Sequence, residues 1–544
     1  MKIFKNGCPT QKKALLCRMY IRRKPNKTGT VSIQVISKHT GTYRVMRSFG
    51  TGRSEQELVR LEEHARQFII EQQGFVGELF ADEDDVRLED FLSTLHNTQV
   101  QVIGPELIFG QLYDKIGYGK IENELFRHLV VSRLFSPGSK LKTIDYLERY
   151  QGINYPKDKI YRFLDTLCKK DNKADKTALR VHDTDIKEIV EDIAFEHTKH
   201  VLRGKIAVVF YDMTTLYFEA SDEDDLRKTG FSKDGKHQCP QIFLGLLTCG
   251  GGYPIGYEIF EGNIFEGHTL IPVLQNIENK YSLGKPVVVA DAALLSEENC
   301  KSLEKSSYKY ILGARVKSLK ENLKEKILSL NLQNNQAKAI KQDDGTRLIV
   351  SMNDKRAKKD RHNREKGLAR LQKRVKNGKL TKASINNRGY NKYLKLEGEV
   401  KITIDEERFL ADAVWDGIKG YVTNTRLSAT KIIEHYGNLW YIERAFRMNK
   451  TDLRIRPIFH HLRNRIQGHI CICFTAYTIL LEMERMLKHE KSEITLKRAQ
   501  ELTKTMYQLT YRLPNSRLTK TKILGMDNRQ QELYDMIVRW LKRK

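Results

Sequence analysis

The chain has 544 residues, 40% hydrophobic and 30% charged, with 95 Lys plus Arg against 68 Asp plus Glu. The length exceeds one ordinary core, so we expect two to four domains, and the hydrophobic content suffices for packed cores. A net charge of +27 favours a polyanionic partner, nucleic acid first, with plain solubilising charge as the alternative.

Cysteines and apolar runs narrow the class of protein further. The eight cysteines include no Cys-x-x-Cys pair, which argues against a structural zinc site or a disulfide framework and indicates a reducing compartment. The N-terminal segment lacks the apolar core of a signal peptide. The longest apolar stretch, 469–483, is too short for a bilayer span and predicts a buried helix. We expect a soluble, cytoplasmic protein that does not contact membranes.

The first 200 residues predict a small sheet followed by helices. Alternation of apolar and polar residues over 17–50 is typical of an antiparallel meander. A helix is expected over 55–73, and the acidic run at 81–85 is a candidate boundary. From about 88 to 200 the spacing is helical, with a break at "SPGSK" (136–140). For this helical module, DNA binding and a scaffold role both remain open.

Strands and helices alternate from residue 205 onward, which predicts an α/β layer with a mixed sheet. Apolar runs predict strands at 206–212, 285–291 and 308–315 and a hairpin at 241–260. After Arg315 this alternation of predicted strands and helices stops for about a hundred residues.

The interruption predicts an insertion inside a bipartite core. Within it, 355–382 holds 13 Lys or Arg against two acids, and 398–424 alternates as strands do. The α/β pattern resumes with one long helix predicted over 427–450. The predicted regions of this multidomain α/β protein are 1–80 (β-meander plus helix), 81–200 (helical, possible DNA-binding module), 201–315 (first half of the core), 316–415 (β-rich, basic insertion), 416–490 (second half of the core) and 491–544 (C-terminal helices).

Two carboxylates end predicted core strands. Asp212 closes the run "IAVVFYD", and Asp291 follows "VVVA". Ligand and catalytic groups of α/β sheets gather at such strand ends. Two neighbouring carboxylates repel each other unless a cation lies between them. For each residue taken alone, an Asp that starts a turn is the alternative.

A third carboxylate, Glu443, lies on the predicted 427–450 helix. It falls within a stripe of residues spaced by three, four or seven positions: Ile432, Tyr436, Leu439, Glu443, Phe446 and Lys450. A Glu in such an inward stripe needs a partner or a metal, because an unpaired buried charge is costly. An internal pair with Lys450 is the alternative.

The three acids together predict a site for Mg²⁺ or Mn²⁺. Hard divalent ions take carboxylate oxygens and require no Cys or His. Two such ions would activate a water or a 3′-hydroxyl and stabilise the leaving oxygen of an in-line phosphoryl displacement. In a basic protein, the phosphodiester of DNA is the natural substrate.

Four segments carry a family resemblance: "YDMTTLYFE", "GFSKDGKHQCPQIFLGLL", "VVVADAALLSEEN" and "YGNLWYIERAFRMNKTDLRIRPIFH". Together they resemble the DDE transposases of the IS4 superfamily, and most of all its IS1634-type group. The resemblance covers nearly the whole chain, including "GTVSIQVISK" and "DKRAKKDRHNREKG". It implies a ribonuclease-H-like core in which Asp212, Asp291 and Glu443 bind two Mg²⁺ (or Mn²⁺) ions, with a β-rich insertion before the glutamate helix.

The resemblance also implies DNA-binding residues around the third acid. The family motif Tyr-x2-Arg-x3-Glu-x6-Lys fits at Tyr436, Glu443 and Lys450, but Leu439 stands at the Arg position. Lys450 would contact a phosphate, and the basic 355–382 segment would hold flanking DNA. Candidates to replace the arginine are Arg444, Arg447, Arg454 and Arg456. Trp440 and Trp415 could stack on a flipped base, with core packing as the alternative for each.

The activity implied is that of a transposase that binds the terminal inverted repeats of its element. It would cleave at the ends and join the 3′-hydroxyls to target DNA, as a homodimer on DNA and associated with the nucleoid. The alternatives are a DNA-binding repressor or inactivated transposase, and an RNase-H-like nuclease without strand transfer. A dehalogenase-type phosphatase is disfavoured, because Thr214 stands where its second acid belongs.

Overall fold

The structure, a computed structural model, describes residues 19–543 except 40–41, 81–82, 169–184, 231, 233–234, 236–237, 379, 382–383, 387–388, 398–400 and 514–517. The chain folds as two compact units, Met1–Val100 with Gln508–Lys522 and Gln101–Tyr507 with Ile523–Lys544. The domain boundaries predicted from sequence remain predictions, since most of them fall inside the second unit.

The first unit contains the expected antiparallel meander, with strand order β1-β2-β3. Its core forms where buried residues of β2, Ile33 and Val35, meet Leu58 and Ala65 on the following helix. That helix runs seven residues beyond the predicted end at Gln73. The elements are β1 (Met19–Pro25), β2 (Val31–His39), β3 (Thr42–Gly52), α2 (Glu55–Phe80) and α3 (Glu83–Ser93), and the strands β15 (Tyr507–Arg512) and β16 (Thr519–Ile523) are neighbours in a separate small sheet.

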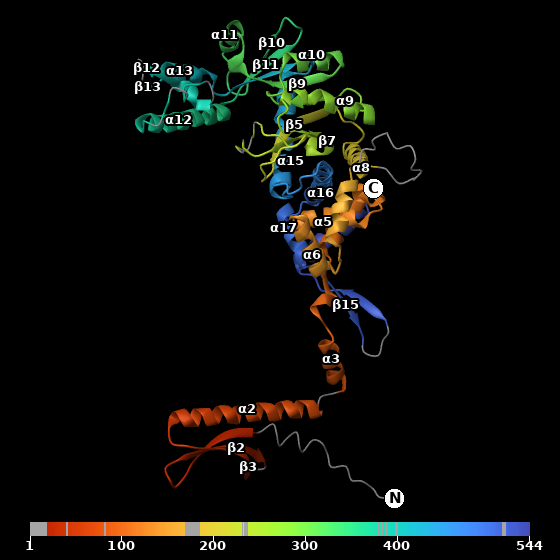
Figure 1. Cartoon of the computed structure of the whole chain (residues 1–544), viewed down its shortest axis with the longest axis vertical. Helices are drawn as coiled ribbons and strands as arrows, with labels where there is room; N and C mark the ends of the chain where they lie inside the picture. The colour runs from red at the N-terminus through yellow and green to blue at the C-terminus, as the bar shows by residue number, and fades with distance from the viewer. Residues whose placement is uncertain are drawn as a thin grey trace. The chain divides into compact units, whose positions relative to one another are not determined.

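The second unit is built around an eight-stranded mixed sheet with the order β10-β11-β14-β9-β8-β5-β6-β7 (Figure 1). Strand β8 pairs in parallel with both β5 and β9, and the other pairs are antiparallel. The strands are β5 (Val208–Tyr217), β6 (Gln241–Thr248), β7 (Pro254–Glu261), β8 (Val287–Ala290), β9 (Lys309–Ala314), β10 (Ala337–Lys341), β11 (Arg347–Met352) and β14 (Ile418–Thr423).

Helices surround this sheet and share its core. Side-chain caps start several of them; for example, Ser296 accepts a hydrogen bond from the N–H of Asn299. The helices outside 316–415 are α4 (Gln111–Ile116), α5 (Glu124–Phe135), α6 (Lys140–Gln151), α7 (Lys157–Thr166), α8 (Ile186–Val201), α9 (Leu270–Tyr281), α10 (Glu297–Lys305), α14 (Ala429–Gly437), α15 (Trp440–Thr451), α16 (Arg463–His489), α17 (Leu496–Leu502) and α18 (Asn528–Leu541), and a short strand, β4 (Val100–Val102), precedes them.

Two sequence expectations about core elements are wrong. Asp212 does not end its strand, because β5 continues to Tyr217 through its pairing with β6. The predicted helix over 427–450 is two helices, α14 and α15, which separate at Asn438 after Gly437. In the turn between them, the N–H groups of Leu439 and Tyr441 donate to the carbonyls three residues back, which changes the angular phase of the helix, so the stripe drawn through Tyr436 and Glu443 does not describe one face.

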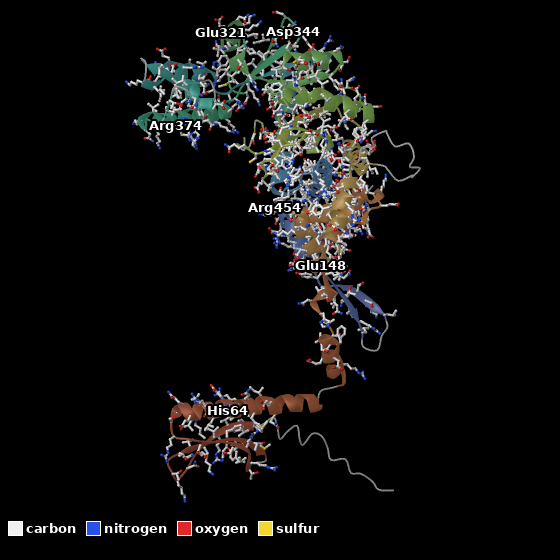
Figure 2. The ribbon with its side chains drawn as sticks, viewed as in Figure 1. His64, Glu148, Glu321, Asp344, Arg374 and Arg454 are labelled. Carbon is white, nitrogen blue, oxygen red and sulfur yellow. The ribbon has the colours of Figure 1, made fainter. Side chains whose placement is uncertain are left out.

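Residues 316–415 are more helical than the β-rich segment predicted. The basic stretch forms one helix, α12, since Asn353 caps it and Lys, Arg, Ala and Leu favour helix. Leu371, Tyr393 and Leu394 form a small core of their own. The elements are α11 (Glu321–Ser329), β10, β11, α12 (Asp354–Lys376), β12 (Leu394–Glu397), β13 (Lys401–Ile404) and α13 (Glu406–Ala411). Figure 2 marks Arg374 on α12.

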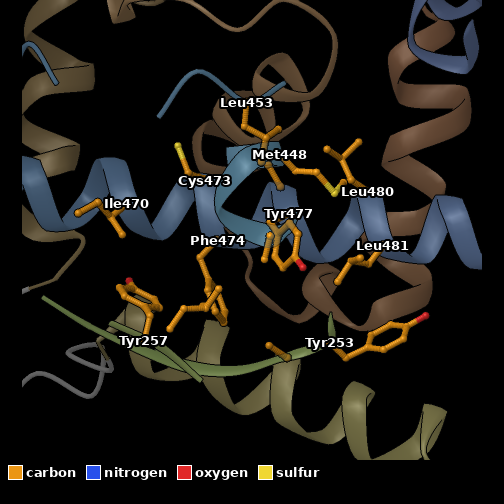
Figure 3. Close-up of a cluster of buried hydrophobic side chains, with 14 of the residues drawn as sticks. Tyr253, Tyr257, Met448, Leu453, Ile470, Cys473, Phe474, Tyr477, Leu480 and Leu481 are labelled. Carbon is orange, nitrogen blue, oxygen red and sulfur yellow. The ribbon is translucent and has the colours of Figure 1, made fainter. Parts of the chain in front are cut away.

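Helix α16 is the predicted buried helix and the centre of the second unit. Phe474 packs at a centroid distance of 4.8 Å on Tyr257 of β7, and the Tyr477 hydroxyl donates to the carbonyl of Gly252 at 2.9 Å (Figure 3). Met448 and Leu453 lie in the same cluster. Within the described part of the chain, every helix is too short or too polar to span a bilayer.

A buried carboxylate ties α16 to two other helices. Glu482 is fully buried and accepts two hydrogen bonds from Arg485, at 2.8 and 2.7 Å, and one from Trp540 of α18 at 2.8 Å. His197 of α8 lies 3.2 Å away. Burial alone would raise the pKa of Glu482, but the contacts with His197 and Arg485 outweigh burial and hold it at about 2.

We expect Glu482→Gln to lower the free energy of unfolding by about 3 kcal/mol, because the substitution leaves buried partners unpaired. Urea unfolding measures the change, with the exposed Glu501→Gln as control. The folded-state pKa lies below the ordinary 4.5, so this stabilisation is present above that pH and is lost as pH falls toward 2. An equal loss in both variants, or a gap between wild type and Glu482→Gln that widens in acid, would contradict this account.

Candidate active site

Two of the predicted acids occupy neighbouring positions in the sheet. The parallel register of β5 and β8 ends at Tyr211 opposite Ala290, and Asp212 and Asp291 are the next residues on each chain. Neighbouring strands are about 4.8 Å apart, so the two carboxylates start from adjacent backbone positions. Both side chains are half-buried. Asp212 accepts a hydrogen bond from the N–H of Met213 at 2.7 Å, and Asp291 accepts one from the N–H of Ala293.

Tyr436 reaches this pair of acids from α14. Its hydroxyl lies against Gly313 of β9, where an added Cβ would clash with it and stand 3.0 Å from the backbone nitrogen of Ala292. Burial raises the pKa of Tyr436, and the charges of Asp291 and then Asp212 act in the same direction. The tyrosine of the predicted motif therefore lies close to the backbone of Ala292, the residue after Asp291.

Lys419 of β14 is a cationic side chain beside Tyr436. Its Nζ lies 4.2 Å from the centre of the Tyr436 ring. Burial lowers the pKa of Lys419 to about 8, Arg356 acts in the same direction, and Glu443 and Asp291 oppose the shift. Glu443 and Asp291 thus both favour the charged form of this amino group.

Glu443 is placed differently from the expectation of an inward-facing residue. It lies in the first turn of α15 with an exposed side chain, while its neighbour Ile442 is fully buried. Among the described residues, no three or more His, Cys, Asp or Glu side chains are gathered closely enough to hold a metal ion. The structure thus brings the two aspartates together and leaves Glu443 within electrostatic range of their surroundings.

A cavity of about 800 Å³ adjoins this group. Ala292, Lys419 and Tyr436 contribute to its wall, and so do the aromatic rings of Tyr390 and Trp415. Its lining is basic, with six cationic side chains against two acids: Arg315, Lys317, Arg356, Arg364, Lys392 and Lys419 against Asp360 and Asp416. Such a lining suits a phosphate-bearing ligand.

The predicted phosphate-binding residues occupy different environments. Arg444 forms an ion pair with Glu484 of α16 at 2.7 Å and is largely buried. Arg447 and Arg454 are exposed, and Lys450 is half-buried. The Arg456 guanidinium lies 5.6 Å from the ring centre of Tyr217 at the end of β5.

The structure also shows where Leu439, which replaces the arginine of the motif, and the two candidate tryptophans lie. Leu439, at the motif's Arg position, is buried in the main core. Trp440 is 46% exposed and packs on Tyr441, which excludes the core-packing alternative for it. Trp415 packs against the apolar cluster around Val316.

Sequence reasoning missed Lys419, Gly313 and Arg356. Lys419 and Tyr421 are two residues apart on β14, so they share one face of the strand. The sequence could have indicated Lys419, because a lysine and a tyrosine two residues apart in a predicted strand point to the same side of the sheet. Gly313 and Arg356 carry no such signal, because their importance depends on what packs against them.

We expect Gly313→Ala to lower the free energy of unfolding by about 1–3 kcal/mol, because the new methyl group collides with the Tyr436 hydroxyl. Adding Tyr436→Phe removes the nearest colliding atom and should restore part of the loss. Gly437→Ala is the matched control, since a Cβ there meets no atom within 4 Å. Equal effects of the two glycine substitutions in thermal unfolding, or no rescue in the double variant, would refute this contact.

Solved structures and protein families give the following similarities. A piggyBac transposase synaptic complex with hairpin DNA is 12% identical, covers 81% of this chain and 79% of its own, and has a TM-score of 0.37. A Mos1 transposase paired-end complex with the left transposon end is 12% identical, covers 34% and 56%, and has a TM-score of 0.15. A Mos1 mariner paired-end complex with Mn is 12% identical, covers 32% and 54%, and has a TM-score of 0.14. No curated protein matches the chain.

The family match covers the part of the chain that carries the candidate site. Residues 203–479 match the family described as "Transposase DDE domain". This range is half of the chain and contains β5, β8 and α15 with their three acids. The chain therefore belongs to the transposase DDE domain family.

Proposed function

We propose that this chain is a DNA transposase of the IS4 superfamily, of the IS1634 type. It binds the terminal inverted repeats of its element, cleaves at the ends and transfers the 3′-hydroxyl ends into target DNA. The observation that carries the proposal is the β5–β8 register, which sets Asp212 beside Asp291 within the family's matched range.

The order of five strands supports a ribonuclease-H-like core. Strands β7, β6 and β5 are antiparallel neighbours, and β8 and β9 follow in parallel with β5. Residues 316–415 separate β9 from the helices that carry Tyr436 and Glu443. This arrangement supports the interpretation of that segment as an insertion in the core.

Asp212, Asp291 and Glu443 would hold two Mg²⁺ or Mn²⁺ ions. The donor chemistry fits, because hard cations take carboxylate oxygens. When bound, the ions would supply an activated water or 3′-hydroxyl and stabilisation of the leaving oxygen. The two aspartates are already adjacent, whereas the Glu443 side chain must turn toward them. Its exposure leaves its rotamers available for this movement.

The residues around the acids have distinct tasks in this proposal. The positive charge of Lys419 offsets the repulsion among the acids, and its ammonium group can form an ion pair with an incoming phosphate. Tyr436 holds its hydroxyl over Gly313 and fixes the face that α14 presents to the DNA. Lys450, Arg447, Arg454 and Arg456 contact phosphates, Trp440 offers an exposed ring for stacking, and Arg444 positions α15 through Glu484.

Helix α12 would hold DNA that flanks the cleavage position. Most of its basic side chains are exposed, and Arg364 anchors it through a 2.7 Å ion pair with Asp416. Because two transposon ends must be brought together, we propose a homodimer on DNA, in the cytoplasm and associated with the nucleoid.

A repressor or an inactivated transposase would bind ends without cleaving them. A nuclease of the same fold would cleave without joining. The retention of all three acids favours a catalytic role over the first alternative. A strand-joining assay separates the second from a transposase, since only a transposase links the ends to target DNA.

We expect Asp212→Asn, Asp291→Asn and Glu443→Gln each to slow Mg²⁺-dependent cleavage of a labelled inverted-repeat end by about a hundredfold or more, roughly 3 kcal/mol in the barrier. Each change removes a carboxylate that holds metal, so end binding in a mobility-shift assay should persist. The exposed Glu434→Gln is the control. Chelation should stop wild-type cleavage, and Ca²⁺ should support binding with little chemistry. If a variant keeps most of its cleavage activity, the substituted residue is not one of the acids that hold the metal ions.

We expect the double substitution Lys359→Gln and Lys366→Gln on α12 to weaken DNA binding and to reduce the slope of log K against log salt by about two, one for each phosphate that a lysine no longer neutralises. Both residues are exposed and seven apart, so they share a helix face. The exposed pair Lys305→Gln and Lys326→Gln is the matched control. An unchanged slope would remove α12 from the DNA interface.

A further inference from the structure

A second basic cavity lies at the N-terminus of α6, at the "SPGSK" break. Its volume is about 560 Å³. Its wall combines Gly138–Lys142 with Arg133 of α5, His469 of α16 and the segment that carries Arg454 and Arg456. The described residues that line it include no Asp or Glu. The lining therefore presents cationic side chains from three separate parts of the second unit: α5, the start of α6 and the segment with Arg454 and Arg456.

Lys140 is the unusual group in this cavity. It is 3% exposed, and among the described residues no hydrogen bond or ion pair to its amino group is present. Burial, followed by the charge of Arg133, lowers its pKa to about 7. A buried ammonium without a counter-charge is costly, so a fold that keeps one indicates that an anion completes the site.

The neighbours of Lys140 repeat this pattern. Arg133 is 4% exposed, and its side-chain contacts with other described residues are long, 3.4 Å to the carbonyl of Leu453 and 3.5 Å to Nδ1 of His469. Burial, with Lys140 next among the causes, lowers the pKa of His460 to about 3. Arg133, Lys140 and the imidazoles of His460 and His469 face one cavity, and the charges of Arg133 and Lys140 act with burial to lower the pKa of both imidazoles.

The start of α6 adds backbone donors to these side chains. Ser139 caps a helix of 12 residues by accepting from the N–H of Lys142 at 3.3 Å. The first-turn N–H groups and the positive end of the helix dipole favour an anion at this point. At the mouth, exposed Lys142 and Arg454 extend the positive charge to solvent (Figure 2 labels Arg454).

We propose that this cavity is a phosphate-binding site, in which Lys140 and the N-terminus of α6 bind the phosphate oxygens and Arg133 and Arg456 complete the neutralisation. The phosphate belongs either to a DNA strand or to a free phosphate or mononucleotide. Only the DNA source rests on the proposed transposase function.

The site is separate from the three acids. Arg456 lies over Tyr217, five residues beyond Asp212 on β5. At about 3.3 Å per residue, this separation along the strand is about 16 Å. A phosphate held here is therefore outside the reach of the acid cluster, and the two sites can fail independently.

The test measures the melting temperature of the full chain in inorganic phosphate and in chloride of matched ionic strength. Phosphate should raise the melting temperature of the wild type. Lys140→Met should weaken this effect at least about tenfold in phosphate concentration, while raising the melting temperature without phosphate by about 2 °C or more, because an unpaired buried charge is removed. Arg456→Gln, at a half-buried position, is the second variant, and exposed Lys120→Met is the control.

A DNA-binding arm distinguishes the source of the phosphate. If DNA supplies it, Lys140→Met and Arg456→Gln should each reduce the salt slope of binding by about one. If these variants keep their DNA affinity but their melting temperature no longer responds to phosphate or to a 5′-mononucleotide, the natural ligand of the cavity is a free phosphate compound. Equal responses of Lys140→Met, Arg456→Gln and wild type to phosphate overturn the site. Asp212→Asn should keep the full phosphate response, so loss of cleavage there does not bear on this cavity.

Discussion

The parallel pairing of β5 with β8 is the constraint on which the candidate site depends. These strands are buried, so their register is fixed by the sheet and by the helices packed on it: α15 contacts β5, and α14 contacts β8 and β9. A shift of one residue would move Asp212 to the other face of the sheet. The register therefore does two things at once: it closes the core and holds two like charges side by side. Such a pair needs positive charge nearby, whichever cation provides it.

Much of the surrounding structure can be understood as the supply of that positive charge. Lys419 comes from the strand that follows 316–415, and Arg356 comes from the first turn of α12 within that segment. Both act on the same neighbourhood as Asp291 and Glu443. The first turn of α12, which carries Arg356, lines the same cavity as Lys419. Its position makes the segment part of the electrostatics of the site, and this is why its removal should disturb more than DNA affinity.

The sequence was informative wherever a local rule decided the outcome. The hairpin of β6 and β7, the buried α16 and the cap at Ser296 follow from alternation, length and capping, which depend on near neighbours. The aspartates were proposed because an acid after an apolar run is locally unusual. Glu443 was proposed from its place in an apolar stripe and in the family motif, but the inward stripe was wrong, since one helix ends at Gly437 and the next begins at Trp440 with a different phase. Lys419 and Gly313 depend on strands paired across a hundred residues, which periodicity does not reveal.

Two groups of like-charged side chains lie along strand β5, one negative and one positive. Near its middle Asp212 lies beside Asp291, a second negative charge, and near its end Arg456 lines a cavity whose described lining residues include no Asp or Glu. The repulsion within either group alone could be offset by favourable packing elsewhere in the fold. Together they suit the proposed substrate, because a DNA strand carries negative phosphates and its divalent counter-ions carry positive charge. A protein built in this way holds part of its binding free energy as unfavourable charge in the unbound state, and the partner relieves it. Its stability should therefore depend on its ligands more strongly than the extent of its core suggests.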